Sequence, residues 1–484
     1  MIREEKKEMY LCFILYIVQS NIDRSQIEEQ KKNTSMAIVV LAGTLDTKGG
    51  EYAFVRDKIL SLNSVSKVVL VNVGVLPATN STLEADINSS EVVAATGLTY
   101  EELRRLSKSD ALQRMSDGLG QILVDLYNKG ELHGVMGMGG GCGSTLLAPA
   151  FRKLPIGVPK LLISSTIACV HGRPFFDFND MTIMYSVTDF IGEINMINKQ
   201  IISNGAVAIA SMAIDYFNNQ AQHFKINETN TQITKKKPII AVTLMGATQK
   251  GLTIAIELLD KLGYEIVTFS PNGITLFELN KEQKKKRYCL VCLGSGSAAM
   301  DHLVKAGLFD GVLDATIFDI MNTVVPDNIW DSTSDRLEAA GRKGIPQVVS
   351  LGGLDILTFG PWSKCPLQYR NRAKFENNAN FATVRTSPDE CTRLGEVIAK
   401  KLNGSQAPVT LLVPRGGLSA LSGPGGPLYD VKADQCLFEA LRNNIDPKVV
   451  QLIERDENIN DPKFAQALAD AVHNQLKHQL SITE

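Results

Sequence analysis

Residues 137–144, GMGGGCGS, place five glycines within seven positions, directly after an apolar run and before a helical pattern. Glycines leave backbone N–H groups open to a phosphate, and the N-terminus of the following helix adds partial positive charge. The spacing completes neither a G-x-G-x-x-G nor a Walker A motif. We predict a phosphate site of irregular form, with a ligand-free close approach of helix and sheet as the alternative, at Gly137, Gly139, Gly140, Gly141, Gly143 and Ser144.

The turn GTLDTKGGE, residues 43–51, follows the first strand pattern and opens a helix. Ligands of open α/β folds bind at the carboxyl ends of strands, where this turn would lie. Lys48 suits a phosphate, and Asp46 suits a metal-bound water or a ribose hydroxyl. The alternative is that Thr or Asp only caps the helix. The candidate ligands of this turn are Gly43, Thr44, Asp46, Thr47 and Lys48.

A third polar segment, ISSTIACVHGRPFFDFND at residues 163–180, also follows a strand pattern. Its candidate nucleotide ligands are Ser165, Thr166 and Asp180. Cys169 and His171 do not favour a catalytic pair, because residues so close in one loop seldom present their side chains for proton exchange. We therefore expect hydroxyl groups that line a pocket.

The second half of the chain has comparable strand ends, LMGATQKG and LGSGSAAM. We expect these ends to line the opposite wall of a cleft, through Gly246, Thr248, Gly294, Ser295, Gly296 and Ser297. No two of these residues define an acid–base pair, since sequence alone does not fix their distances. The catalytic residues are therefore unassigned, and whether the protein is an enzyme stays open.

The elements that must position these residues follow from hydrophobic patterning. From residue 36 onward, apolar runs rich in β-branched residues alternate with helical patterns, as in parallel α/β sheets. Most runs contain few charges, which is typical of strands buried on both faces. The order strand, glycine turn, Lys-Gly and helix occurs near residue 38 and again near residue 239. We predict an α/β protein with two Rossmann-like lobes, whose parallel sheets are flanked by helices and face one cleft.

These patterns also divide the chain. The N-terminal extension, which has charged and apolar parts, is expected to be poorly ordered. A polar stretch that contains lysines is typical of a linker, and the pattern of the tail predicts helices that pack on the lobes. A basic insertion at about 271–292 is either tolerated or absent from the mature protein. The predicted segments are the extension 1–35, the first lobe 36–217, the linker 218–237, the second lobe 238–430 and the C-terminal helices 431–484.

Composition narrows the class of protein. The 484 residues are 44% hydrophobic and 21% charged, with a formal net charge of −2, which offers no strongly basic face for nucleic acid. The apolar run near the N-terminus is too short to span a bilayer. Eight scattered cysteines, with a single CxxC, favour free thiols in a reducing compartment over a metal site. We expect a cytoplasmic homodimer that binds neither nucleic acid, nor membranes, nor a structural metal.

Several motifs in chain order resemble one family: GTLDTKGGEYAFVRD, ADINSSEVVAATG, MTIMYSVTDF, RLEAAGRKGIPQVVSLGGLDILTFGP and INDPKFAQALADAV. They are similar to the ATP-binding domain family typified by the N-terminal domain of the tomato mosaic virus resistance protein, otherwise an uncharacterised family of bacteria, fungi and plants. The resemblance extends from Met36 to the last helix. It implies a two-lobed Rossmann-like fold with a nucleotide site on its glycine-rich loops.

The resemblance also shows departures. Cys142 stands at a family glycine, where its Cβ would crowd a phosphate or block a positive φ. The family's serine-rich loop becomes STIACV, and its next motif becomes DFND, which keeps Asp180. These changes cluster in the expected ligand loops, so a shifted ligand specificity is an open alternative.

Three functions are consistent with these observations. The first is binding of a nucleotide, with ATP as the leading ligand and Mg²⁺ as a candidate companion near Asp46 or Asp180. The second is a transferase or hydrolase that acts on a small phosphorylated or acidic metabolite. The third is a protein-interaction module, since in the plant relative this domain binds viral replication proteins.

Overall fold

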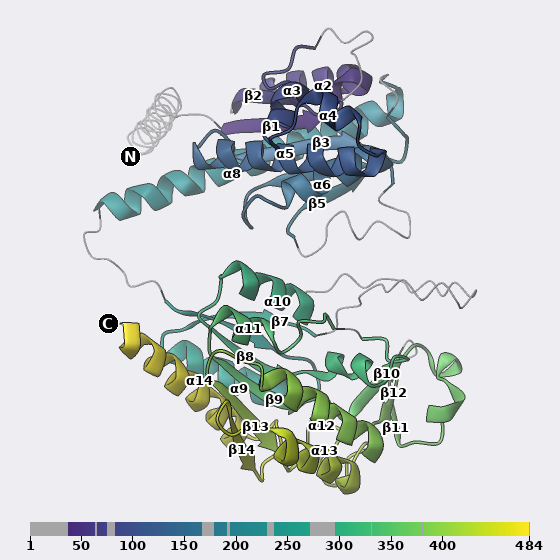
Figure 1. The fold of residues 1–484 in the computed structure, drawn as a ribbon, viewed down its shortest axis with the longest axis vertical. Coiled ribbons are helices and arrows are strands. Elements are labelled where there is room, and N and C mark those ends of the chain that lie inside the picture. Colours follow the sequence, from purple (N-terminus) through teal and green to yellow (C-terminus); the bar gives the residue numbers. More distant parts are fainter. Residues whose placement is uncertain are drawn as a thin grey trace, which may run out of the picture. The chain divides into compact units, whose positions relative to one another are not determined.

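The computed structural model describes residues 37–62, 65–74, 83–166, 179–190, 194–229, 237–271, 296–330, 332–378 and 381–483. The chain forms two compact units, Met1–Ile233 and Thr234–Glu484 (Figure 1). The predicted N-terminal extension, nearly all of the predicted insertion and the CxxC lie outside the described residues. In the part that is described, no helix is long and apolar enough to cross a membrane.

The first unit is built on a five-stranded sheet in which all neighbouring strands are parallel. β1 and β3 are buried along almost their whole length, which explains why their sequences lack polar alternation. Across the sheet the strands are β2 (Val65–Asn72), β1 (Ala37–Gly43), β3 (Gly134–Gly139), β4 (Lys160–Ser164) and β5 (Thr182–Tyr185).

Helices cover both faces of this sheet (Figure 1). One face carries α2 (Leu45–Leu60) and α8 (Met196–Thr229), whose apolar side chains pack with Val39 and Leu41 of β1. The other face carries α3 (Ser89–Ala94), α4 (Tyr100–Arg104), α5 (Lys108–Asn128) and α6 (Gly141–Phe151). α8 continues through the first half of the predicted linker, because its helical backbone ends only at Thr229.

The second unit contains a six-stranded parallel sheet. Across it lie β14 (Val450–Arg455), β13 (Val409–Pro414), β9 (Gln347–Gly352), β8 (Gly311–Thr316), β6 (Ile239–Thr243) and β7 (Glu265–Phe269). The tail predicted as helices alone therefore also supplies an edge strand, β14. Strand β14 pairs with β13 over six residues, and this pairing ties the tail into the sheet.

Two layers of helices enclose this second sheet. α9 (Gln249–Lys261) and α14 (Pro462–Thr483) pack on one face, around Leu252 and Phe464. The other face carries α10 (Ser297–Ala306), α11 (Ala339–Lys343), α12 (Pro388–Leu402) and α13 (Val431–Asn444). Both units are therefore parallel α/β sheets flanked by helices, which confirms the predicted Rossmann-like class.

A small antiparallel sheet in the second unit was not expected from the sequence. Its strands, in order, are β10 (Ile356–Phe359), β12 (Phe381–Arg385) and β11 (Lys374–Asn378). β11 reads KFENN and lacks a buried apolar pattern, so backbone pairing with β12 specifies it. Leu357 and Val384 anchor this sheet in the same core as Leu411 of β13.

Candidate functional site

The order of strands in the first unit places two of the predicted segments beside each other. β1 connects to β2 on one side and has β3 on the other, and α2 and α6, which follow β1 and β3, pack on opposite faces. The loops that leave β1 and β3 therefore diverge at the carboxyl edge of the sheet. Ligands of open α/β sheets bind at such a switch point. The segments 43–51 and 137–144 contain these two connections, which are short because α2 begins at Leu45 and α6 begins at Gly141.

Tyr52 of α2 fixes the two strands beneath these loops. Its buried hydroxyl lies 2.8 Å from the Ala42 carbonyl oxygen and accepts the Met138 backbone N–H at 2.7 Å. Burial raises the pKa of Tyr52 well above its usual value, so the hydroxyl stays neutral. A Cβ at Gly43 would lie 1.9 Å from this hydroxyl oxygen. Gly43 therefore makes room for Tyr52, which explains that glycine by packing.

Two glycines of the glycine stretch are explained in the same way. A Cβ at Gly137 would lie 2.8 Å from Leu147 Cδ1, and one at Gly139 would lie 2.9 Å from Gly143 Cα. Contacts under 3 Å require a neighbour to move, and the Ala42 carbonyl oxygen, 2.9 Å from a Cβ at Gly137, is backbone, as is Gly143 Cα. Gly137 and Gly139 therefore serve the packing of helix on sheet.

Gly141 and Gly143 of the stretch face open space. A Cβ at Gly141 would meet only Thr166 Cγ2 at 3.9 Å, and one at Gly143 only the Met138 carbonyl oxygen at 3.7 Å. Gly140 is the N-cap of α6 and supplies no side-chain cap. The Ser144 N–H donates to the Gly140 carbonyl at 2.9 Å, whereas the N–H groups of residues 141–143 precede the first helical hydrogen bond. The start of α6 thus offers three backbone donors.

Hydroxyl groups from β4 complete this edge. Ser144 Oγ lies 2.7 Å from Ser164 Oγ, which lies 3.2 Å from Thr166 Oγ1. Ser144 and Ser164 are fully buried, so they fix the loop and cannot reach a ligand. Ser165 and Thr166 are half-buried at the end of β4, next to Gly140 and Gly141.

Asp189, which follows β5, was missed by the sequence reasoning. Its Oδ1 accepts the Ser165 hydroxyl and the Phe190 backbone N–H, each at 2.9 Å. A Cβ at Gly140 would lie 3.3 Å from both Asp189 Oδ1 and Ser165 Oγ. The signal was present, because Asp189 comes three residues after the strand pattern MTIMYS, and the other candidates also follow strand patterns. Hydroxyl and carboxylate oxygens are the donor type that Mg²⁺ prefers, so this set fits the ion.

The turn after β1 holds its polar residues close together. Thr47 Oγ1 donates to Thr44 Oγ1 at 3.2 Å, and Lys48 Nζ donates to Thr47 Oγ1 at 3.3 Å. Lys48 has non-helical φ and ψ of −132° and 23°, so α2 is kinked there. Asp46 lies against Gly74, where an added Cβ would be 2.3 Å from Asp46 Cγ. Asp46 therefore occupies the β2 side of the turn.

Asp180 does not lie with the other candidates. It precedes β5, and its Oδ1 pairs with Lys160 Nζ at 2.8 Å at the first residue of β4. Its Oδ2 accepts the Gly157 N–H at 2.7 Å. Asp180 is thus at the amino-terminal edge of the sheet, opposite the glycine stretch. Because β4 and β5 are parallel, the residue that precedes β5 lies at the opposite edge of the sheet from the residues that follow β4.

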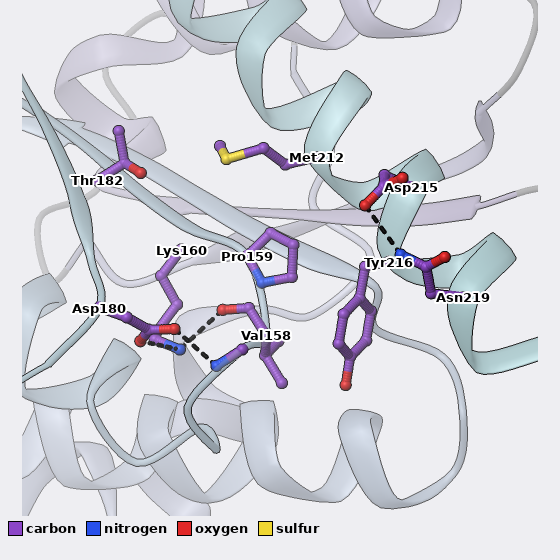
Figure 2. Close-up of a pocket in the computed structure, with 10 residues that line it drawn as sticks. Val158, Pro159, Lys160, Asp180, Thr182, Met212, Asp215, Tyr216 and Asn219 are labelled. Carbon is purple, nitrogen blue, oxygen red and sulfur yellow. Dashed lines mark hydrogen bonds and ion pairs between the residues drawn. The ribbon is translucent and has the colours of Figure 1, made fainter. Parts of the chain in front are cut away.

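At this amino-terminal edge lies a cavity of about 320 Å³ (Figure 2). The starts of β4 and β5 and one face of α8 form its wall, with Lys160, Asp180, Met212, Asp215 and Tyr216 among the lining residues. Lys160 donates to the Pro155 and Val158 carbonyl oxygens as well as to Asp180. This ammonium has no further hydrogen to offer a phosphate. The cavity is therefore distinct in chemistry from the glycine stretch.

Of the site residues predicted in the second unit, some have free space around them and others are buried. A Cβ at Gly246 would meet nothing within 4 Å, so that glycine is open. Thr248 is fully buried, with its Oγ1 2.8 Å from Thr316 Oγ1, across the switch point between β6 and β8. Gly296 is the N-cap of α10, and the buried Ser297 hydroxyl donates to Asp319. Gly294 and Ser295 lie outside the described residues.

A buried ionic cluster follows β8 in the second unit. Arg336 is fully buried, and its Nη2 donates to Asp314 Oδ1 at 2.8 Å while its Nε donates to Asp319 Oδ2 at 2.9 Å. Burial raises the pKa of the nearby Asp301 to about 7, although Arg336 opposes the shift. The cluster joins α10, β8 and the turn after β8, and its burial indicates a structural role. Arg336 begins the motif RLEAAGRKG, but its aspartate partners lie 17 and 22 residues earlier in the chain, so local sequence did not indicate the pairing.

A second buried network joins β12 to α13. Arg385 Nη2 donates to Asp434 Oδ1 at 2.6 Å, and the Ser419 hydroxyl donates to Asp355 Oδ2 at 2.5 Å. Burial raises the pKa of Asp434 to about 6.

Within the described ranges, no three His, Cys, Asp or Glu side chains come together as metal ligands.

Comparison with known proteins gives relatives along nearly the whole chain. A UPF0261 protein of Clostridium tetani is 32% identical over 440 residues, which cover 91% of this chain and 99% of that protein. A UPF0261 protein of Rhizobium meliloti is 33% identical over 439 residues, covering 90% and 98%. The ToMV resistance protein Tm-1(GCR237) of Solanum lycopersicum is 32% identical over 458 residues, which cover 90% of this chain but 55% of the tomato protein.

Among solved structures, a UDP-GlcNAc 2-epimerase from Neisseria meningitidis bound to UDP-GlcNAc is 11% identical, with a TM-score of 0.20 over 65% of this chain and 82% of the epimerase. The glycosyltransferase SnogD from Streptomyces nogalater is 10% identical, with a TM-score of 0.20 over 91% of this chain and all of that one. These TM-scores are too low to support a conclusion about ligands.

The family assignment rests on sequence. The N-terminal domain of uncharacterised protein family UPF0261 matches residues 37–218, and its C-terminal domain matches residues 277–476. Both matches fall in chain order, and the bacterial relatives share almost their full length with this chain. The chain therefore belongs to the uncharacterised protein family UPF0261.

Proposed function

We propose that the first unit binds a nucleotide, with ATP as the leading ligand, at the switch point between β1 and β3. The observation that carries the proposal is the start of α6, where three backbone N–H groups precede the first helical hydrogen bond and two glycines face open space. A phosphate fits there because the donors and the helix dipole both favour negative charge. The motifs of the chain resemble those of an ATP-binding family, so ATP is the first nucleotide to test.

Side chains at neighbouring strand ends support the same ligand. Ser165 and Thr166 lie beside Gly140 and Gly141, and their hydroxyls suit phosphate oxygens. Lys48 and Thr47 lie on the adjacent turn, which leaves β1 next to β3. We assign the packed residues Gly43, Gly137, Gly139 and Ser144 the role of shaping the loops. Asp180 is not part of the proposed site.

Magnesium is proposed as the companion of the phosphates. A bare phosphate at Gly140 would lie near the Asp189 carboxylate, and like charges repel. Mg²⁺ typically takes one or two carboxylates together with substrate phosphates. Asp189 and Ser165 would hold the ion, whose positive charge would offset both anions. Asp46, which lies on the β2 side of the turn, is the less suitable partner.

A glycine substitution separates this proposal from a fold without a ligand. Gly141→Ala adds a methyl group where the chain leaves space, so the unfolding midpoint should change by less than about 2 °C. The same methyl group would crowd a phosphate on the Gly141 N–H, so ATP affinity, measured by titration with Mg²⁺ present, should fall at least about tenfold.

Gly404→Ala is the matched control, because Gly404 is exposed in the second unit and an added Cβ there would be 3.5 Å from the Lys401 carbonyl oxygen. It should leave both stability and ATP affinity unchanged. Equal ATP affinity in parent and Gly141→Ala would contradict the proposed position of the phosphate.

A further inference from the structure

We propose that the cavity at the amino-terminal edge of the first sheet is a second binding site, which takes a small organic cation with an apolar body. The cavity measures about 320 Å³, which equals the liquid volume of roughly ten water molecules. It lies at the opposite edge of the sheet from the proposed nucleotide site. The two sites therefore share no lining residue.

Two groups of residues line the cavity (Figure 2). On one side, Lys160 and Asp180 join the starts of β4 and β5 at 2.8 Å. On the other side, Met212, Asp215, Tyr216 and Asn219 share one face of α8, because they are spaced three, four and seven residues apart. The strand starts and the helix face belong to the same compact unit, so the wall of the cavity is preformed.

The charges of the lining residues select the sign of the ligand. The Lys160 ammonium donates its three hydrogens to the Pro155 carbonyl oxygen, the Val158 carbonyl oxygen and the Asp180 carboxylate. Asp180 in turn accepts from Lys160 and from the Gly157 N–H. The pair is neutral, and its lysine has no hydrogen left to donate to a ligand. Asp215 adds one negative charge, so the lining has an excess of one carboxylate and attracts a cation.

The apolar lining residues favour a ligand whose uncharged part is apolar. Val158, Pro159, Met212 and the Tyr216 ring contribute to the lining. An aromatic ring attracts an organic cation through its negative face, and a thioether adapts to an apolar group. Asp215 accepts one hydrogen bond, from Asn219 Nδ2 at 3.0 Å, and a carboxylate can accept several. An ammonium on a short apolar body satisfies both requirements.

The test uses phenethylammonium as the probe, with phenylacetate as its anionic counterpart of similar size. In ligand-observed NMR titrations of the full chain, the cation should bind saturably, and phenylacetate should bind at least about tenfold more weakly. Asp215→Asn should reduce affinity for the cation about tenfold, because it replaces a charged acceptor by a neutral one.

Asp125→Asn is the matched control. Asp125 is also an exposed helical aspartate of the first unit and accepts from an amide one turn away, Gln121, at 3.0 Å. This variant should keep the parent affinity. Failure of the cation to bind to folded parent protein, equal binding of phenylacetate, or equal binding by Asp215→Asn would each overturn the proposal. ATP titrated into Asp215→Asn should bind as in the parent, so the two proposed sites fail or succeed separately.

Discussion

At the scale of single residues, the glycine stretch contains two kinds of glycine. Gly137 and Gly139 have neighbours that leave no room for a Cβ, whereas Gly141 and Gly143 have none that would clash. Packing therefore explains only part of the stretch. Packing does not explain why Gly141 and Gly143 are glycines. A ligand in contact with their backbone would explain it.

Cys142 provides a prediction at this scale. It is exposed in the first turn of α6, and its φ is not positive, so the expected backbone conflict is absent. Cys142→Gly should lower the unfolding midpoint by about 1–3 °C, because glycine costs up to about 1 kcal/mol in a helix. ATP affinity should change less than threefold by calorimetric titration. Binding that tightens tenfold would show instead that the cysteine side chain obstructs the phosphate.

At the scale of elements, the helices differ in how they begin. α4, α5, α12 and α13 have a Thr, Ser or Asp N-cap whose side chain accepts a backbone N–H. α2, α6, α9 and α10, which follow strands of the parallel sheets, have no side-chain cap. Backbone donors at a helix start must find partners elsewhere, such as water or a ligand. α11 lacks a side-chain cap too, and the other four uncapped starts belong to segments that the sequence singled out.

The position of α10 predicts a dependence of stability on pH. Burial beside Asp314 and Asp319 raises the pKa of Asp301 to about 7, while Arg336 and Thr333 act in the opposite direction. The folded chain thus holds a proton that the unfolded chain has released above about pH 4, so stability falls as pH rises toward 7. Between pH 5.5 and pH 7 the loss should be roughly 1–2 kcal/mol.

Asp301→Asn should remove this loss, because its amide stays neutral. The unfolding midpoint of the variant, relative to the parent, should therefore rise by about 3–6 °C between pH 5.5 and pH 8 in calorimetric scans. Asp260→Asn, at an exposed position of α9, is the control and should show no such trend. Parallel midpoints of Asp301→Asn and parent across this pH range would refute the shifted titration of Asp301.

At the scale of the whole molecule, the sequence predicted the architecture of both parallel sheets. The strands that it identified are long apolar runs, and burial on both faces makes such runs unmistakable, as in β3 and β13. β11 and β14 were missed, because edge strands carry polar residues and owe their conformation to pairing with a neighbour. Pairing partners distant in the chain leave no trace in local sequence.

The candidate site was predicted less completely than the fold. Strand ends located the loops, and the parallel sheet brings Gly140 and Ser165 together as the sequence indicated. Asp180 lies at the opposite edge of the sheet, because it immediately precedes β5, which runs parallel to β4. Asp189 was overlooked although its position after β5 obeys the same rule.

The central claim is that phosphate groups of a nucleotide bind at the start of α6. The most direct measurement is a calorimetric titration of the full chain with ATP and Mg²⁺, paired with a titration of adenosine under the same conditions. We predict saturable binding of ATP and at least about hundredfold weaker binding of adenosine, because the backbone donors contact phosphate. No binding of ATP to folded protein, or equal affinity for adenosine, would contradict the claim.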